Sequence, residues 1–258
     1  MATNDEHPAS LVLAVSTVIF ALRPSTRTGK MSLHIPVVRR IREPYEGLWA
    51  LPGGPLGMQE DLGESARRHL LSTTHLDPTY LEQLYAFGDR DRSRTNGIAR
   101  GDRVVSIVYW ALVRSGPGAV EYSGIVRPAD EVVPGDDNVV WIDADELPEL
   151  AFDHTEIVAY ALWRLRTKLE YSRIAHSFLG EMFTLAQLRE VHEAVLRREL
   201  DPANFRRMIE ATGSVEPTGT LLQGTPHRPP KLYRYVENPA ESTPGQTPHP
   251  TPATKERS

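Results

Sequence analysis

The chain has 258 residues, of which 40% are hydrophobic and 24% charged, a composition typical of globular proteins with one large domain or two ordinary ones. It contains no cysteine, which excludes disulfides and thiolate metal sites and agrees with an expected cytoplasmic location. The net charge of −5 conceals −8 in residues 1–163 and +3 in residues 164–237, which indicates a polyanionic partner for the second region. No apolar run is long enough to cross a bilayer, so we expect no membrane contact.

Two paired strands are expected near the start of the chain. Residues 11–22 and 31–41 are rich in β-branched side chains and partly alternate in polarity, and a Ser/Thr/Gly-containing turn separates them. Arg39 and Arg40 end the second strand. Because successive strand residues face opposite sides, only one of these arginines can point into any given pocket. The sequence leaves open whether they contact an anion or are solvated edge charges.

A glycine-rich loop and an expected helix follow at residues 47–76. The loop runs from residue 47 to 57, and helical spacing of apolar residues begins near Glu60. Asp61 and Glu64 suit the positive N-terminal end of that helix, and Glu64 lies four residues before Arg68. The backbone N–H groups of such a segment can approach a phosphate.

This segment resembles the signature of Nudix hydrolases, G-x5-E-x7-R-E-U-x-E-E-x-G-U, in which U is a bulky apolar residue. Aligned on Gly54, Glu60 and Arg68 fall in register, and Trp49 and Gly53 resemble the family's approach to the motif. The resemblance covers about the first 160 residues. It implies an α/β fold, the Nudix-like α/β/α sandwich, over residues 11–163.

The metal-binding positions of the signature are altered. In a working Nudix enzyme, carboxylates at the positions here numbered 69, 72 and 73 share one helix face and hold Mg²⁺ against a diphosphate. This chain has His69, Ser72 and Thr73 there, and His75 replaces the later glycine. Neutral or weakly basic groups cannot gather a hard cation or generate a metal-bound hydroxide. We therefore expect no metal, no cofactor and no catalysis.

Further strands are expected at residues 80–87, 103–113 and 138–142, and a short capped turn of helix at 143–150. The polar loop 88–97 between the first two is dense in arginine. It either covers a ligand or forms a solvated hairpin tip. The residues expected to bind a ligand are Arg39, Arg40, Trp49, Gly53, Gly54, Glu60, Arg68 and Arg90.

Helical periodicity then runs from Thr155 to about Leu179 without an internal glycine or proline after Val158, which predicts a stiff connection between two domains. We place the boundary near residue 164, with the second domain at 164–237. Residues 1–10 are expected to be flexible, and the Pro/Thr/Ser-rich residues 238–258 to be a disordered tail.

The sequence predicts two helices and a hairpin in the second domain. Thr184 and Gln187 form a capping box before an amphipathic helix. On its apolar side, His192 is expected to be a packed, hydrogen-bonded core histidine, with a functional role as the alternative. Asp201 and Pro202 mark the start of the next helix as N-cap and first residue. A glycine-hinged β-hairpin with Arg228, Lys231 and Tyr233 follows, which fits a wing touching DNA phosphates.

On the helix that begins at Pro202, an apolar stripe of Phe205, Met208 and Ile209 is expected to face the core. Asn204, Arg206 and Arg207 lie on the other side. Arginine can bond bidentately to guanine and asparagine to adenine, so this face could read a major groove. The alternative is the solvated face of an ordinary helical hairpin.

The complete pattern is similar to the Nudix-related transcriptional regulators of NAD metabolism, most specifically in residues 204–207 and in Arg228-Pro229. The resemblance implies a winged helix-turn-helix after the Nudix-like domain. It also implies a homodimeric, operator-binding regulator, in the first instance a repressor, of NAD biosynthesis or salvage genes, with ADP-ribose or a related nucleotide as effector. The DNA-contact candidates are Thr184, Asn204, Arg206, Arg207, Arg228, Lys231 and Tyr233.

Two other functions remain open from the sequence. One is an active hydrolase of a nucleoside diphosphate-linked substrate, in which Glu60 with Asp61 or Glu64 replaces the usual metal ligands. The other is a scaffold whose Nudix-like pocket binds nothing.

Overall fold

The computed structural model describes residues 11–25, 27–75, 78–90, 92, 94–95, 98–99, 103–114, 138–171, 174–223 and 229–236. The expected flexible N-terminus and disordered tail lie outside these residues, as does Arg228. None of the helices in the described part of the chain combines the length and apolar character that a membrane span requires.

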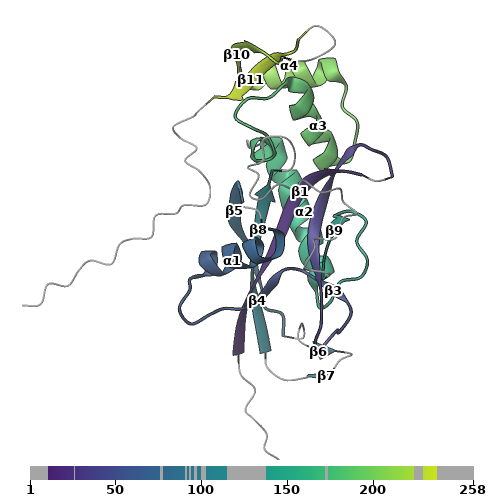
Figure 1. Cartoon of the computed structure of the whole chain (residues 1–258), viewed down its shortest axis with the longest axis vertical. Coiled ribbons are helices and arrows are strands. Elements are labelled where there is room, and N and C mark those ends of the chain that lie inside the picture. Colours follow the sequence, from purple (N-terminus) through teal and green to yellow (C-terminus); the bar gives the residue numbers. More distant parts are fainter. Residues whose placement is uncertain are drawn as a thin grey trace, which may run out of the picture.

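A mixed seven-stranded sheet forms the centre of the first region (Figure 1). Its path is β3-β2-β1-β8-β5, with β4 paired to β1 and β9 paired to β2. β1 and β8 run parallel, and the other pairs are antiparallel. The strands are β1 (Leu11–Pro24), β2 (Met31–Arg39), β3 (Trp49–Ala50), β4 (Gly53–Pro55), β5 (Tyr80–Phe87), β8 (Arg103–Val113) and β9 (Val139–Asp143); the short β6 (Arg94–Thr95) and β7 (Ile98–Ala99) pair separately.

Helices α1 (Leu62–Thr74) and α2 (His154–Tyr171) cover opposite faces of this sheet. The alternation of β1 divides its side chains between two buried clusters. Ile19 and Ala21 pack with Leu70 of α1, whereas Phe20 and its alternate neighbours pack in the cluster that contains Ile157 of α2. The expected α/β/α sandwich is confirmed.

The ends of α1 follow from its sequence. Asp61 is the N-cap and forms a capping box with Glu64, so the expected Glu64–Arg68 pair is not made. At the other end His75 is the C-cap and adopts φ 56°, a left-handed conformation that glycine adopts at no steric cost. This explains why the Nudix signature has a glycine at this position.

Two helical predictions are wrong in part. Residues 144–150 form turns without a helix, because Pro148 disfavours helical backbone at Leu147 and the Asp143 carboxylate accepts a hydrogen bond from the Asp145 N–H. The continuous helix expected to residue 179 ends at Tyr171, and a separate 3₁₀ helix, η1 (Ile174–Phe178), follows.

The second region has the expected order of two helices and a hairpin at one end of the sandwich (Figure 1). Its elements are α3 (Leu185–Leu196), α4 (Pro202–Thr212), β10 (Val215–Leu221) and β11 (Lys231–Tyr235). The Thr184–Gln187 capping box and the Asp201 N-cap with Pro202 at the first helical position are confirmed.

The two regions share one hydrophobic core. A single cluster of buried residues continues from Phe20 through Leu165 of α2 to Leu188 of α3 and Phe205 of α4. The Thr79 hydroxyl also donates to the Ser177 carbonyl of η1 at 2.7 Å. The domain boundary near residue 164 remains a prediction, and α2 passes through it.

Candidate functional site

A cavity of about 370 Å³ opens at the glycine-rich end of the sheet. It lies between β1, β4 and β8 and the segment that leads into α2. Its lining combines apolar residues with hydroxyls, a histidine and two arginines: Val12, Ala14, Ser16, Arg40, Pro44, Ala50, Leu51, Gly53, Gly54, Pro55, Arg92, Val104, Ser106, Phe152 and His154. This set contains no carboxylate.

Arg92 is held in one position at the cavity wall. Its side chain is only 6% exposed and donates to both carboxylate oxygens of Asp153, at 2.8 and 2.7 Å. It also donates to the Ser106 hydroxyl at 2.7 Å and to the Phe87 carbonyl at 3.1 Å. Asp153 offsets most of its charge, so Arg92 chiefly offers fixed N–H groups.

Arg40 is also fixed, but no carboxylate of the described chain is hydrogen-bonded to it. Its Nε donates to the Pro44 carbonyl at 2.8 Å, and its guanidinium carbon lies 4.6 Å from the centre of the Phe152 ring. Burial lowers the pKa of Arg40 from its usual value. Such a group would be stabilised by an anionic ligand.

His154 also lines this cavity and is neutral. Its Nδ1 accepts a hydrogen bond from the Leu51 N–H at 3.0 Å, so the neutral ring carries its proton on Nε2. Burial lowers the pKa of His154 to about 4. At neutral pH the ring therefore acts as a donor and an apolar surface, without charge.

A second cavity, about 360 Å³, adjoins the first and shares Arg40, Ala50, Leu51 and Gly53 with it. Its other polar residues are Arg39 and Arg42 on one side and His69, Ser72 and Thr73 on the other. The prediction that positions 69, 72 and 73 share one face is confirmed.

These residues do not fit a magnesium ion. The Ser72 and Thr73 hydroxyls both donate to the His69 carbonyl, at 3.0 and 2.8 Å, and burial lowers the pKa of His69. No carboxylate of the described residues lines this cavity either. Among the residues that the structure describes, no three His, Cys, Asp or Glu side chains are grouped so that they could hold a metal.

At the other end of the molecule, α4 presents a polar face. Asn204, Arg206 and Arg207 are exposed, whereas Phe205 and Ile209 are buried. Arg206 pairs with Glu210 at 2.9 Å, and the Arg207 guanidinium donates to the Asn204 side chain. The three candidate base-reading residues thus lie on one accessible surface, held by partners on their own helix.

Family comparisons agree with both ends of the chain. The model of the NrtR DNA-binding winged helix domain matches residues 175–235, and that of the NUDIX domain matches residues 13–161. The ADPR responsive transcriptional repressor NtrR of Acinetobacter baylyi is 30% identical over 238 residues, which cover 90% of this chain and 85% of that protein. The chain belongs to the NrtR family of transcriptional regulators.

Two further proteins are similar to this NrtR-family chain. The crystal structure of Shewanella oneidensis NrtR complexed with a 27mer DNA is 30% identical, with a TM-score of 0.66, over 87% of this chain and 93% of that one. The ADP-ribose pyrophosphatase of Methanocaldococcus jannaschii is 31% identical over 133 residues, 50% of this chain and 67% of that enzyme. The expected fold, a Nudix domain followed by a winged helix, is confirmed.

Of the expected ligand-binding residues, Arg40, Gly53 and Gly54 line the first cavity and Arg39 lines the second. Glu60 and Arg68 line neither cavity and bind each other. Arg68 donates to both Glu60 oxygens, at 2.9 and 2.7 Å, and the Gly57 N–H donates to Glu60 at 2.7 Å. These bonds, from Arg68 first, lower the pKa of Glu60 to about 2. The pair fixes the loop before α1.

Trp49 and Arg90 line neither cavity. Trp49 is partly buried on β3 and packs against the core, and Arg90 is exposed. Arg92, two residues further along, occupies the cavity wall. The arginine-rich composition of this loop was the available signal, but it did not indicate which arginine turns inward.

Two expected DNA contacts are buried, which argues against them. The Thr184 hydroxyl accepts from the Gln187 N–H in the capping box, and Thr184 is 4% exposed. Tyr233 is 7% exposed, and its backbone pairs with that of Phe183. Lys231 is exposed and stays a candidate, as does Arg228, which lies outside the described residues.

Two expectations about packing in the winged helix have different outcomes. Met208 is 49% exposed, so its place in the buried stripe of α4 is wrong. His192 packs edge-on against Phe205 with ring centres 5.2 Å apart, and burial lowers its pKa to about 4. The prediction of a packed histidine is confirmed.

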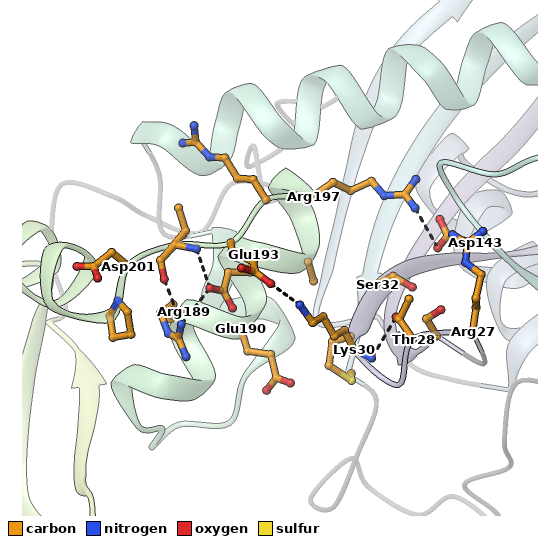
Figure 2. Close-up of a pocket in the computed structure, with 17 residues that line it drawn as sticks. Arg27, Thr28, Lys30, Ser32, Asp143, Arg189, Glu190, Glu193, Arg197 and Asp201 are labelled. Carbon is orange, nitrogen blue, oxygen red and sulfur yellow. Dashed lines mark hydrogen bonds and ion pairs between the residues drawn. The ribbon is translucent and has the colours of Figure 1, made fainter.

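Ion pairs join the Nudix domain to the winged helix around a third cavity, about 680 Å³ (Figure 2). Lys30, in the turn between β1 and β2, pairs with Glu199 between α3 and α4. Arg197, at the end of α3, pairs with Glu146 at 3.0 Å, and Glu146 also pairs with Arg27. Sequence reasoning did not identify this junction, because its members are distant in the chain.

Proposed function

We propose that this protein is a repressor of NAD biosynthesis or salvage genes that binds its operator as a homodimer and responds to ADP-ribose without hydrolysing it. One observation carries this proposal. Among the described residues, the two adjoining cavities of the Nudix domain are lined by four arginines, Arg39, Arg40, Arg42 and Arg92, and by no carboxylate. Such a lining favours an anionic ligand and disfavours a divalent cation.

The size and composition of the cavities suit a nucleotide. Volumes of about 370 and 360 Å³ lie within the range of about 300–1,000 Å³ for small-molecule sites. Val12, Val104 and Phe152 offer apolar contacts for a base or a ribose. His154 and the fixed guanidinium of Arg92 add polar groups that can set its orientation. The effector named for the Acinetobacter relative, ADPR, has the matching parts: a base, riboses and a diphosphate.

The output surface of the proposed regulator is α4 with the wing. Asn204, Arg206 and Arg207 are exposed together, as base reading in a major groove requires. Lys231 at the start of β11 is placed to contact phosphate. One helix contacts only a few base pairs, so two copies on two half-sites are needed for a specific operator.

The junction between the domains gives a physical route for the response. β2 runs from the Lys30 turn to Arg39, which lines the second cavity, and β9 pairs along it. A ligand can shift the winged helix only if it binds two arrangements of the protein with different affinity. We propose that those arrangements differ in the ion pairs of Glu146 and Glu199.

A Nudix hydrolase is the second candidate, because the Methanocaldococcus relative is named as an ADP-ribose pyrophosphatase. The carboxylates that could replace the usual metal ligands are all engaged. Glu60 accepts from Arg68 and Gly57, while Asp61 and Glu64 accept from each other's backbone N–H groups. None of them lines either cavity, which favours the regulator.

Two measurements on the full-length protein test the proposal. In a gel-shift titration with DNA from upstream of NAD-biosynthesis genes, we expect a specific complex that ADP-ribose weakens. In a parallel incubation with ADP-ribose and Mg²⁺, we expect no AMP. Steady formation of AMP would support the hydrolase instead, and no thermal shift with ADP-ribose, NAD or ATP would leave the pocket without a ligand.

A further inference from the structure

The second cavity occupies the place where a Nudix enzyme holds its metal, but its charges have the opposite sign. Positions 69, 72 and 73 carry no carboxylate, and Arg39 and Arg42 line the same cavity. In the described chain neither guanidinium has a hydrogen-bonded or ion-paired partner. Unpaired arginines at the wall of a cavity are available to a ligand.

We infer that the diphosphate of the nucleotide lies in this second cavity and is held directly by Arg39 and Arg42, with no divalent cation between ligand and protein. This inference rests on the proposed function and names the part of the ligand that each cavity takes. The base and its ribose lie in the first cavity against Phe152, and the phosphates lie beyond Arg40.

The continuity of the two cavities supports this division. Arg40 lines both. Gly53, which also lines both, passes so close to β1 that an added Cβ would lie 2.6 Å from the Val15 carbonyl oxygen. A Cβ at Gly54 would lie 3.0 Å from the His69 ring. The two glycines therefore allow this segment to pack closely against β1 and against His69 of α1.

The charges explain how the site can work without metal. Carboxylates beside a diphosphate repel it, so an enzyme that has them needs Mg²⁺ to bridge the two. When the carboxylates are replaced by His69, Ser72 and Thr73, that repulsion is absent. Arginine binds phosphate through parallel N–H groups, and these charge-assisted hydrogen bonds are stronger than neutral ones.

A consequence is that magnesium does not assist binding and can oppose it. Mg²⁺ in solution associates with a diphosphate and neutralises part of the charge that Arg39 and Arg42 would bind. The affinity for ADP-ribose should therefore be at least as high in EDTA as in millimolar Mg²⁺. A metal-bridged site would show the opposite order.

Calorimetric titration of the full-length protein with ADP-ribose, in EDTA and in Mg²⁺, tests the inference. We expect binding in EDTA, and a loss of about tenfold or more when Arg39 and Arg42 are both changed to alanine, because the charge-assisted hydrogen bonds to the phosphates are then lost. Adenosine, which has no phosphate, should bind both proteins equally. Arg67→Ala removes an exposed arginine of α1 that lines neither cavity and is the control.

The reciprocal test is a variant that restores carboxylates to the metal-binding positions of the Nudix signature. Ser72→Glu with Thr73→Glu should abolish binding in EDTA and regain part of it with Mg²⁺. The inference is overturned if wild-type binding requires Mg²⁺, or if the arginine double variant binds ADP-ribose normally. Either result leaves the proposed regulator intact. If a different nucleotide binds in EDTA through Arg39 and Arg42, ADP-ribose is not the effector, but the inferred phosphate site is correct.

Discussion

The arginines of the Nudix cleft and those of helix α4 differ in how they are held. Arg92 is almost fully buried and makes four hydrogen bonds to the rest of its domain, whereas Arg206 and Arg207 are exposed and bond only along their own helix. The cleft is thus organised before a ligand arrives. The α4 surface must exchange its own pairs for DNA contacts, so a single copy should bind weakly and with strong salt dependence. Under the proposed function, one chain binds the small ligand, whereas two copies are needed to bind an operator.

The shared core predicts that these two differently organised regions unfold together. Leu165 is fully buried in α2 within the cluster that spans both, so Leu165→Ala should lower the free energy of unfolding by about 2–5 kcal/mol. All four tryptophans lie in the first 163 residues, so their fluorescence reports the Nudix domain and far-UV circular dichroism reports both. Denaturant transitions should coincide by both probes. Two separate transitions would show independent domains.

Acid should destabilise the protein through a buried histidine of the cleft. Burial lowers the pKa of His154 from 6.5 to about 4, so the unfolded chain takes up the proton first as pH falls. His154 is 7% exposed, and the shift corresponds to about 3 kcal/mol of stability that is present above pH 6.5 and lost by pH 4. Chemical denaturation of wild type and His154→Asn across this range measures it. If the free energy of unfolding depends on pH equally in the two proteins, the account of His154 as a buried, neutral histidine is wrong.

On the DNA side, Arg207→Ala should weaken operator binding by about 1–3 kcal/mol and leave the affinity for ADP-ribose unchanged. Fluorescence anisotropy with labelled operator at physiological salt measures operator binding, and calorimetry measures the affinity for ADP-ribose. Lys231→Ala is the matched comparison. Because Lys231 is expected to contact phosphate, its loss should weaken binding to all DNA sequences about equally. It should also reduce the slope of the logarithm of the binding constant against the logarithm of salt concentration by about 1. An unchanged operator affinity for Arg207→Ala would remove that residue from the reading surface.

The smallest expected effect concerns the communication between the two sites. Glu146 pairs with both Arg27 and Arg197 at the junction, so Glu146→Gln should reduce the coupling between ADP-ribose and operator by about 0.5–2 kcal/mol. The coupling is the ratio of operator dissociation constants with and without ligand. The affinity for operator alone and the affinity for ADP-ribose alone should each change less than this ratio. Glu149→Gln, a nearby acid outside this network, is the control, and equal coupling in both variants would exclude the junction as the route.

Sequence alone predicted the parts of this molecule that depend on neighbours in the chain. The capping box at Thr184, the start of α4 at Asp201 and the alternation of β1 are local signals, and each appears as expected. The shared face of positions 69, 72 and 73 follows from helical geometry in the same way.

The cleft could be predicted only in part, because it is built from distant segments. The Leu51 N–H donates to His154, 103 residues away, and Arg92 pairs with Asp153 across 61 residues. No local pattern brings these residues together. Glu60 and Arg68 matched the family signature, which did not indicate that they pair with each other and line neither cavity.

The central claim, that a Nudix domain without metal ligands controls a DNA-binding winged helix, is tested most directly by one titration. The full-length protein is bound to labelled operator in EDTA, ADP-ribose is added while anisotropy is followed, and the mixture is then analysed for AMP. The account predicts release of the operator with the ADP-ribose recovered intact. An unchanged complex at saturating ADP-ribose, or release that occurs only when Mg²⁺ is supplied and AMP is formed, would contradict it.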